Sequence, residues 1–301
     1  MGKDFEVALS PGWRGSRTPQ ACIIGLGLIG GSWAGALARL GWKVCAVDSD
    51  ERSLGAAKSI GWIKEGWTEI PEKVDFDLMI LALPISSLSD CFSQIVGRVQ
   101  PGAVITDVGS IKKEICELSK DLQDVYFIGG HPMTGSERNG FSAAHPDLFK
   151  GYPYVITPQT HCPEEVINLF SELLQSLGAT VIYRDHEVHD REVAMVSHVP
   201  HLLALALALS ASEGFPEGKP LELAGRSFRE FTRLVDSSPE MWRDILIRNA
   251  PAILSSLDIW EEKIQEIRCK IRNFDGEGII NVFERAQQAR GRVLNRRLAD
   301  E

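Results

Sequence analysis

The chain has 301 residues, of which 44% are hydrophobic and 24% are charged, and its formal net charge is −9. This is the composition of a soluble globular protein, and it excludes a disordered, collagen-like or disulfide-rich chain. The acidic balance, without any block rich in Lys and Arg, argues against nucleic acid as a partner and requires that an anionic substrate be held by a few placed cations.

Three further features limit the class of protein. The six cysteines are widely spaced and form no C-x-x-C pair, so they are expected to be reduced, buried thiols rather than zinc ligands. Residues 1–20 lack the apolar segment of a signal peptide and are expected to form a loose leader. The most apolar stretch, Leu202–Leu209, is roughly half of the ~18 residues that a membrane span requires. We therefore expect a core helix there, no membrane association and a cytoplasmic protein.

The first half of the chain alternates short apolar runs with helical stretches, a pattern typical of a parallel sheet covered on both faces. A helix is expected over Glu164–Leu177, followed by an edge strand over Thr180–Tyr183. The other predicted strands are Ala21–Ile24, Lys43–Val47, Leu78–Leu83, Ala103–Asp107, Tyr126–Gly129 and Tyr154–Thr157. The predicted fold is α/β, with a Rossmann dinucleotide-binding domain over residues 21–185.

The second half has helical periodicity almost throughout. Helices are expected over Glu187–Ala211, Pro220–Leu234 and Pro239–Ser256, and a long polar helix runs from Leu257 to about residue 298 with an interruption at Asn273–Gly278. A boundary near residues 184–187 therefore separates the Rossmann domain from an all-helical domain over residues 186–301. We expect that domain to bind substrate and to form a homodimer, because its long amphipathic segments cannot all be covered within one chain.

A glycine-rich turn connects the first predicted strand to a helix. The hexapeptide reads Gly25-Leu26-Gly27-Leu28-Ile29-Gly30. In this context Gly25 permits the tight turn, Gly27 lets the backbone approach a pyrophosphate, and Gly30 lets helix pack on strand, while the helix N-terminus offers free N–H groups. A glycine-rich turn without a ligand is the alternative interpretation.

Two neighbouring segments complete the predicted cofactor site. Asp48 ends the second strand, where it can accept both ribose hydroxyls and would repel a 2′-phosphate, so NAD is expected rather than NADP. Arg52 is the nearby cation that could weaken this preference. Leu83 and Pro84 end the strand that begins at Leu78 and are expected to lie under the cofactor, although Pro84 could also serve only as a strand terminator.

Two further segments emerge at strand ends, where functional side chains concentrate. The first runs from Asp107 through Ser110 to Lys112, and the second begins at Gly129 and contains His131. A lone histidine is more often structural than catalytic. The position of His131 between a strand and a Pro/Gly-rich turn nevertheless favours a functional role.

These motifs together resemble the prephenate/arogenate dehydrogenase family of tyrosine biosynthesis. The segments that carry the resemblance occur in the family's order and cover residues 21 to about 290. They are Gly25–Gly30, Asp107–Lys112, Gly130–Glu137, Ser197–His201, Phe231–Arg233 and Met241–Asp244. The resemblance implies an NAD-binding Rossmann domain, a helical domain that dimerises, and an active site between them, with Asp107 among the cofactor residues.

The resemblance assigns the chemistry to His131, which would hold the ring hydroxyl of the substrate while hydride leaves the carbon that bears it. Ser110 would orient this imidazole, or alternatively would cap the helix that starts near Ile111. Arg233 would grip a substrate carboxylate, since a planar guanidinium can make two parallel bonds to it. The other substrate residues that the resemblance implies are His201, Ser136, Glu137, Glu230 and Trp242.

Some of these residues also have plainer interpretations. Glu230 could form an ordinary helix salt bridge, and Trp242 could be core packing. His198, three residues before His201, is expected to be structural, and a metal site at this pair lacks a third ligand. In one place the chain departs from the family: Arg226-Ser227-Phe228 stands where relatives commonly have two glycines before the Phe, which puts the preference for the substrate's side chain in doubt.

The function expected from the sequence is NAD-dependent oxidative decarboxylation of prephenate to 4-hydroxyphenylpyruvate, or of arogenate to tyrosine, without a metal. A related 3-hydroxyacid dehydrogenase would need a lysine where His198 and His201 stand, and a non-catalytic NAD sensor would not need His131, Ser110 and Arg233 together. The length leaves no room for a regulatory domain or a fused mutase, so any inhibition by tyrosine is expected at the active site.

Overall fold

The computed structural model describes residue 13 and residues 17–72, 75–135, 138–214 and 220–299. The chain divides into two compact units, residues 1–250 and residues 251–301. The first unit holds an α/β layer structure and the helices that follow it. The second holds a pair of long helices.

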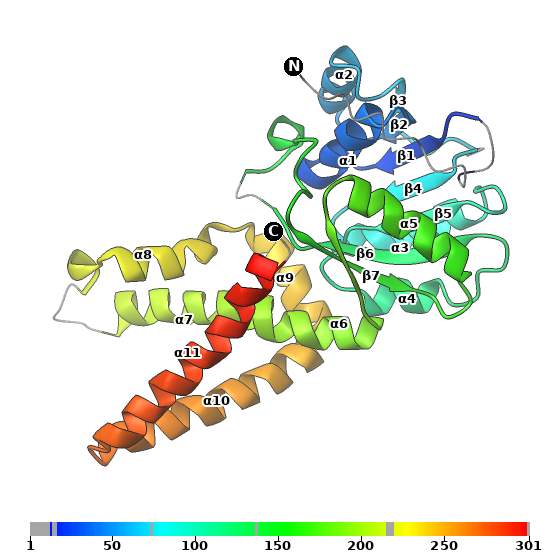
Figure 1. Ribbon diagram of the computed structural model, residues 1–301. Coiled ribbons are helices and arrows are strands. Elements are labelled where there is room, and N and C mark those ends of the chain that lie inside the picture. Colours follow the sequence, from blue (N-terminus) through cyan, green and yellow to red (C-terminus); the bar gives the residue numbers. More distant parts are fainter. Residues whose placement is uncertain (1–12, 14–16, 73–74, 136–137, 215–219, 300–301) are drawn as a thin grey trace, which may run out of the picture. The chain divides into compact units, whose positions relative to one another are not determined.

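The described part of the first unit contains an eight-stranded sheet with the order β3-β2-β1-β4-β5-β6-β7-β8 (Figure 1). Neighbouring strands are parallel except β6 and β7, which are antiparallel. The strands are β1 Gln20–Ile24, β2 Lys43–Val47, β3 Glu65–Trp67, β4 Leu78–Leu81, β5 Val104–Asp107, β6 Tyr126–Pro132, β7 Pro153–Pro158 and β8 Thr180–Tyr183.

Two features of this sheet differ from the sequence prediction. The three-residue strand β3 was not predicted, because a glycine flanked by one acidic and one aromatic residue has no clear strand pattern. The strand expected to end at Gly129 continues to Pro132, so His131 lies within β6 and pairs with Val155 of β7. Between β6 and β7 the described chain has only the short η1 (Phe141–Ala143) and no crossover helix, and it returns antiparallel.

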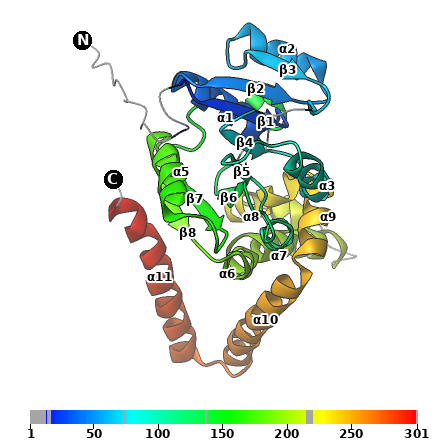
Figure 2. The same cartoon turned by 90° about the vertical axis from the view of Figure 1, so that its right-hand side faces the viewer.

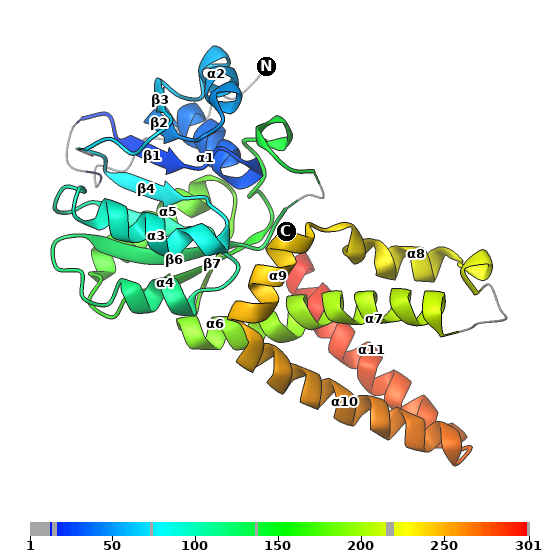
Figure 3. The same ribbon diagram turned by 180° about the vertical axis from the view of Figure 1, so that it is seen from behind.

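Helices cover both faces of the sheet (Figures 2 and 3). The bounds are α1 Leu28–Arg39, α2 Glu51–Ser59, α3 Ile85–Val96, α4 Lys113–Leu118 and α5 Glu164–Ser176. On one face Trp33 of α1 stacks against Phe170 of α5, and on the other Phe92 of α3 contacts Phe127 of β6 edge to face. These two cores hold the carboxyl ends of the parallel strands at one edge of the sheet.

Two expectations about the periphery need correction. Trp13 is buried against Trp42 and Arg17 pairs with Asp77, so the described residues of the segment expected to be a loose leader are packed on the domain. All six cysteines are free, but Cys269 is exposed and Cys45 is only partly buried. These contacts of Trp13 and Arg17 are made with residues distant in the sequence, so they have no local sequence pattern.

The helical part begins with a continuous rod made of α6 (His186–Val193), the π-helical turn η2 (Ala194–His198) and α7 (Val199–Glu213). Pro200 in the first turn of α7 has no backbone N–H, and a π turn is a common way to absorb such a break. The rod was expected to be a core helix, but Leu207 and Leu209 are exposed. By length and composition alone, His186–Glu213 could cross a membrane, and only 28% of its most apolar window is buried within the described chain.

The remaining helices are more broken than predicted. The stretch from Pro220 consists of η3 (Pro220–Leu223), α8 (Arg226–Thr232) and η4 (Arg233–Asp236). The helix expected over Pro239–Ser256 is divided at Asn249 into α9 (Pro239–Arg248) and the start of α10 (Ala250–Arg272). The predicted interruption before α11 (Gly276–Ala299) is confirmed, and there Phe274 adopts a left-handed backbone with φ of 55°.

Candidate active site

The glycine loop fits a dinucleotide. Gly25 has φ of 95°, and a Cβ on it would lie 2.3 Å from the carbonyl oxygen of Ala82, while a Cβ on Gly30 would lie 1.8 Å from that of Gly25. These two glycines are therefore required by the fold. A Cβ on Gly27 would meet nothing within 4 Å, and Gly27 caps α1 without a side-chain hydrogen bond. The free N–H groups of the first helical turn, at Leu28 and Ile29, thus face open space that suits a pyrophosphate.

Asp48 lies beside this loop. Its carboxylate accepts hydrogen bonds from the backbone N–H groups of Leu26, at 2.5 Å, and Asp50, at 2.8 Å. These bonds orient the carboxylate at the end of β2 and leave lone pairs on both oxygens. Leu83 is half-buried, and its side chain lies 3.1 Å from the position of a Cβ on Gly25, whereas Pro84 is exposed and caps α3. The predicted cofactor residues of β1, β2 and β4 therefore meet at one edge of the sheet.

Asp107 has a different environment from the one expected. It is fully buried, and its carboxylate is bound by the Lys112 ammonium and by the backbone N–H groups of Gly109 and Gly130. The ammonium also donates to the carbonyl oxygen of Gly130 at 2.7 Å. This buried ion pair joins the end of β5 to β6, directly before His131. The carboxylate of Asp107 therefore bonds within the protein, and a contribution of this residue to cofactor binding stays a prediction.

Ser110 is not the cap of the following helix. Helix α4 begins at Lys113, and its first backbone N–H groups are bound by the carboxylate of Asp190, which accepts from Lys112 at 2.8 Å and from Lys113 at 2.9 Å. The half-buried hydroxyl of Ser110 makes no hydrogen bond to any residue that the structure describes. The capping interpretation of Ser110 is thereby removed, and the hydroxyl remains available for a ligand.

His131 is the outer member of a line of three side chains. Its Nδ1 lies 2.9 Å from Nε2 of His189, and Nδ1 of His189 lies 2.7 Å from the carboxylate of Asp190. His189 and Asp190 are both buried. Burial holds the pKa of His131 well below its usual range, and the nearby His189, Lys112 and His198 lower it further. The ring of His131 is therefore neutral at physiological pH, as a proton acceptor must be.

A second group of rings lies next to these residues. Asn249 donates to the backbone carbonyl of Asp190 at 2.9 Å and contacts Nδ1 of His198 at 3.2 Å. His198 meets the Trp242 ring edge to face, and His201 stacks on that ring at a centroid separation of 3.7 Å. Burial lowers the pKa of His198 to about 4 and that of His201 below its usual value. The catalytic and substrate-binding candidates from β6, α7 and α9 are thus joined by one chain of contacts.

The predicted carboxylate-binding end is more open. Arg233 lies in η4, which packs against α7, and its side chain is exposed and makes no ion pair with any residue in the described ranges. Glu230 is also exposed and forms a salt bridge with Arg226 at 2.6 Å, which is the ordinary helix pair that its spacing allows. Ser136 and Glu137 lie outside the described residues. Whether Glu230 contacts substrate remains a prediction.

Three residues of the site were missed by sequence reasoning, namely His189, Asp190 and Asn249. The only signal for the first two is a histidine and an aspartate side by side near the start of a predicted helix, which is also the pattern of an exposed polar turn. Their burial depends on the docking of α6 against α4, more than 70 residues apart in sequence. Local patterning carries no information about such a contact.

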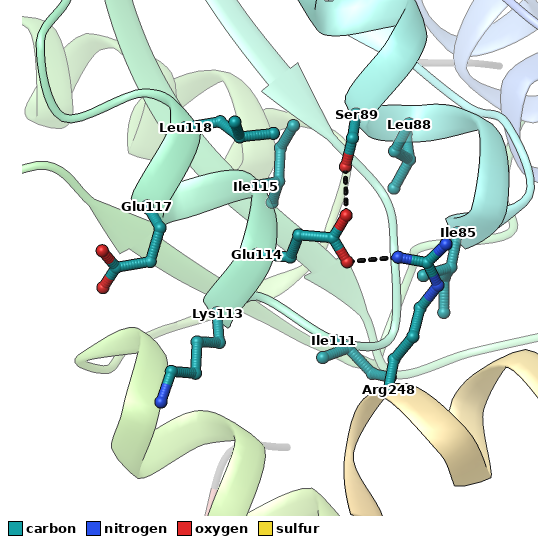
Figure 4. A pocket seen from close by; sticks show the side chains of 10 residues that line it. All are labelled: Ile85, Leu88, Ser89, Ile111, Lys113, Glu114, Ile115, Glu117, Leu118 and Arg248. Atoms are coloured by element: carbon teal, nitrogen blue, oxygen red, sulfur yellow. Dashed lines mark hydrogen bonds and ion pairs between the residues drawn. The ribbon is translucent and has the colours of Figure 1, made fainter.

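The best-formed surface pocket lies elsewhere. It is bounded by α3, α4 and α9, and inside it Glu114 accepts from Ser89 and pairs with Arg248 (Figure 4). Neither His131 nor the glycine loop lines it. Because Glu114 and Arg248 already pair with one another inside it, we assign the chemistry to the histidine line instead. Among the described residues, no group of three or more His, Cys, Asp or Glu side chains is arranged to hold a metal ion.

The parallel sheet, the glycine loop with its acidic strand end, and the neutral histidine at the same edge define the class of this protein. It is a nucleotide-binding dehydrogenase of the Rossmann type.

Comparison with known proteins identifies the family. Residues 33–183 match the nucleotide-binding domain of prephenate dehydrogenase, and residues 185–285 match the prephenate dehydrogenase dimerization domain. The chain belongs to the prephenate dehydrogenase family.

Three similar proteins illustrate the match. Prephenate dehydrogenase of Lactococcus lactis is 34% identical over 89% of this chain and 75% of its own length. The structure of Aquifex aeolicus prephenate dehydrogenase in complex with hydroxyphenyl propionate and NAD+ superposes with a TM-score of 0.85 at 27% identity, covering 92% of this chain and 99% of that one. Synechocystis arogenate dehydrogenase superposes with a TM-score of 0.82 at 27% identity, covering 91% and 99%.

Proposed function

We propose that this chain catalyses the oxidative decarboxylation of prephenate, with arogenate as the alternative substrate at the same site. The observation that carries the proposal is the placement of the His131 ring at the cofactor edge of the sheet, with Nδ1 bound to His189 and Nε2 making no hydrogen bond to any described residue. Burial holds the pKa of this ring well below its usual range, which favours the neutral form that accepts a proton. Family membership supplies the substrate class, since the matched relatives are named for prephenate and arogenate.

The protein's part in the chemistry is to move one proton. Nε2 of His131 accepts the proton of the ring hydroxyl as the C–H bond of the same carbon breaks, which offsets the positive charge that hydride loss creates. NAD, when bound, supplies the acceptor of that hydride. The bond to the ring carboxylate then breaks and its electron pair enters the ring, which becomes aromatic as CO₂ departs. His131 returns the proton to the ring oxygen, so atoms and charge balance without a metal.

The substrate's acid groups are assigned to the open end of the site. Arg233 is the exposed cation next to α7, and a guanidinium can bind a carboxylate through two parallel hydrogen bonds. We assign the stacked rings of His201 and Trp242 to a wall of the same site. Ser110 is assigned to the hydroxyl end of the substrate, because its own hydroxyl has no partner in the described chain. Glu230, Ser136 and Glu137 are retained as predicted contacts.

We assign NAD rather than NADP to the nucleotide site. The Asp48 carboxylate is fixed by two backbone N–H groups at the end of β2, where it would accept from ribose hydroxyls and repel a 2′-phosphate. The relative from A. aeolicus, whose structure contains NAD+, supports this assignment. Arg52, the nearby cation that could weaken the preference, is exposed and uses its backbone N–H to bind Asp50.

We further propose a cytoplasmic homodimer that buries α7. This helix is apolar on all sides, and Leu207 and Leu209 are exposed in the single chain. The segment lies within residues 185–285, which match a dimerization domain. A membrane span is disfavoured because α6, the first part of the same rod, carries His189 and Asp190 in a buried polar network. Sedimentation without detergent should show a stable dimer, and a stable monomer or a detergent requirement would contradict the proposal.

Tyrosine, which is the product of arogenate oxidation and shares the aromatic ring of the product of prephenate oxidation, is proposed to inhibit at the active site. Inhibition should then be competitive with the cyclohexadienyl substrate. A non-competitive pattern would argue against this mode of inhibition.

The direct test of the function is a side-by-side assay of NADH and CO₂ formation from prephenate and from arogenate, with NAD and with NADP. We expect equimolar NADH and CO₂ with at least one substrate and a preference for NAD. Absence of turnover with both substrates would overturn the proposal and favour a non-catalytic nucleotide sensor. Preference between the two substrates would show how Arg226, beside Glu230, influences side-chain selection.

A further inference from the structure

We propose that His189 and Asp190 are positioning residues that fix the tautomer of His131, so that its Nε2 is always the unprotonated nitrogen that faces the substrate. This inference rests on the proposed function of His131. It adds two residues of α6 to the machinery that acts through that histidine.

The direction of each hydrogen bond follows from Asp190. Its carboxylate accepts from the backbone N–H groups of Lys112 and Lys113, at 2.8 and 2.9 Å, which can only donate. Because each oxygen already accepts from one of these backbone N–H groups, the buried carboxylate is arranged as a hydrogen-bond acceptor toward His189 as well. Nδ1 of His189, at 2.7 Å, must therefore carry its proton toward Asp190.

The direction of the hydrogen bond between His189 and His131 follows in the same way. A neutral His189 with its proton on Nδ1 presents a lone pair on Nε2. That nitrogen lies 2.9 Å from Nδ1 of His131, so His131 must donate from Nδ1 and keep Nε2 unprotonated. An imidazole in water prefers the opposite tautomer, with the proton on Nε2. The line from Asp190 through His189 therefore reverses the intrinsic preference of the catalytic candidate.

This arrangement serves the proposed proton transfer in two ways. It aims a lone pair, rather than an N–H group, at the substrate hydroxyl before the substrate arrives. It also places an ionised carboxylate at the far end of the line, where it stabilises the positive charge that His131 acquires when it takes the proton. An aspartate that orients a catalytic histidine through a single hydrogen bond is a known device, and here a second imidazole extends it.

A second buried histidine of the site, His198, is expected to have the opposite tautomer and serves as an internal comparison. Asn249 directs its amide N–H groups at the backbone carbonyl of Asp190, at 2.9 Å, and at Nδ1 of His198, at 3.2 Å. Because the carbonyl can only accept, the amide nitrogen is correctly placed, and Nδ1 of His198 must be the acceptor. His198 is therefore expected to carry its proton on Nε2. Two buried histidines of one site should thus show opposite tautomers.

The test is ¹⁵N NMR of the full-length protein labelled at its histidine rings, without ligand and at neutral pH. Ring nitrogens that carry a proton are distinguished from those that do not by chemical shift and by coupling pattern. We expect Nδ1–H for His131 and His189 and Nε2–H for His198, with assignments taken from the His131→Asn, His189→Gln and His198→Asn variants. Nε2–H at His131 in the wild-type protein would overturn the inference.

Two substitutions of His189 distinguish a role in orienting the His131 ring from a role in folding alone. His189→Leu removes the acceptor of the His131 proton, so His131 should revert toward Nε2–H and kcat should fall by about 10²–10⁴-fold with little change in KM. His189→Gln can still accept through its amide oxygen, so it should retain Nδ1–H at His131 and recover part of kcat. His186→Gln, on the same helix and in contact with Glu117 at the surface, is the matched control and should leave both readouts unchanged.

The possible failures can be told apart. If the wild-type tautomers are as expected but neither prephenate nor arogenate is oxidised, the positioning role stands and the proposed function fails. If the protein turns over substrate but His189→Leu keeps wild-type kcat, the positioning role fails and the function stands. Circular dichroism and the melting temperature of each His189 variant show whether a loss of activity is due only to unfolding. If His189→Leu proves to be unfolded, the kcat of His189→Gln and the tautomers in the wild-type spectrum decide whether the positioning role holds.

Discussion

The two ends of the proposed substrate site are built in different ways. At the hydroxyl end, Nδ1 of His131 is held by a line of two buried residues, His189 and Asp190, while Nε2 makes no hydrogen bond to any described residue. At the carboxylate end, Arg233 is exposed and unpaired among the described residues, and its neighbour Glu230 is neutralised by Arg226 on the helix surface. The single chain thus holds the proposed proton acceptor, His131, in a packed network. It leaves the proposed carboxylate-binding residue, Arg233, exposed.

This difference indicates which side chains of the site are ordered before the substrate binds and which can be ordered by binding. A proton acceptor needs a fixed tautomer and a fixed direction, which only a packed network supplies. An arginine that grips a carboxylate can be ordered by the ligand or by a second copy of the chain, and its exposure lets an acidic protein offer an accessible cation to an anionic substrate. Substitutions at the first end should therefore affect kcat, and substitutions at the second should affect KM.

The largest effect is expected from His131→Asn. Asparagine cannot accept and return a proton, so kcat should fall by about 10²–10⁴-fold while KM changes little. Steady-state NADH formation measures both constants, and His145→Asn, at an exposed histidine of the same unit, is the control. A His131→Asn variant with near wild-type kcat would show that the hydroxyl end is not where the chemistry occurs.

The next effect concerns the stability of the layer beneath His131. Asp107→Asn leaves the Lys112 ammonium buried without a counter-charge, which should lower the free energy of unfolding by roughly 3–5 kcal/mol. The double variant Asp107→Leu with Lys112→Met should be less destabilised than the single one. Chemical denaturation measures this, and KM for NAD in the folded enzyme should stay near its wild-type value. A large specific rise in KM for NAD would instead indicate that Asp107 contributes directly to cofactor binding.

At the open end, Arg233→Gln should raise KM by roughly 10- to 100-fold and change kcat little, because about 1.5–3 kcal/mol of charge-assisted hydrogen bonding to the carboxylate is lost. Arg233→Lys keeps the charge but not the two parallel hydrogen bonds, so its KM should lie between those of the wild-type enzyme and Arg233→Gln. Kinetics with both prephenate and arogenate give the constants. The division between the two ends breaks down if Arg233→Gln lowers kcat and leaves KM unchanged.

The smallest effect is the shape of the pH profile. The pKa of His131 lies well below its usual 6.5 because of burial first and then the nearby His189, Lys112 and His198. A base with a lowered pKa stays unprotonated as pH falls through neutrality, so kcat/KM should be level around pH 7 and decline only well below pH 6.5. Initial rates at subsaturating substrate between about pH 5 and about pH 9 report this value. A decline that begins above pH 6.5 would contradict the buried, neutral imidazole.

Much of the Rossmann half was predictable because its determinants are local. The run at Lys43–Val47 forms a mostly buried parallel strand with the predicted bounds, since such strands require continuous apolar residues. The run at Thr180–Tyr183 forms the predicted edge strand, also with the predicted bounds. The glycine loop was also readable, because two of its glycines meet backbone closely and the third faces open space. By contrast, β7 pairs antiparallel with β6 because the described chain between them forms no crossover helix. The hydrophobic periodicity of the two strands does not predict this pairing.

The site was predictable only where a residue acts at the end of its own strand or motif. His131 lies at the sheet edge that the sequence predicts, although within β6 rather than in the turn after it. The residues that contact it come from α6, and no local pattern encodes the docking of α6 against α4. The buried environment of the Asp107 carboxylate was not predictable for a related reason. A carboxylate at a strand end has the same sequence signature whether it faces a ligand or, as here, a buried lysine five residues later.

The most direct test of the account is a crystal structure of this chain with NAD and hydroxyphenyl propionate, the pair bound in the A. aeolicus relative. We predict that the phenolic oxygen lies within about 2.6–3.2 Å of Nε2 of His131 and that the guanidinium of Arg233 binds the carboxylate of the same molecule. A complex in which the ligand touches only one of these two side chains, or neither, would contradict the account.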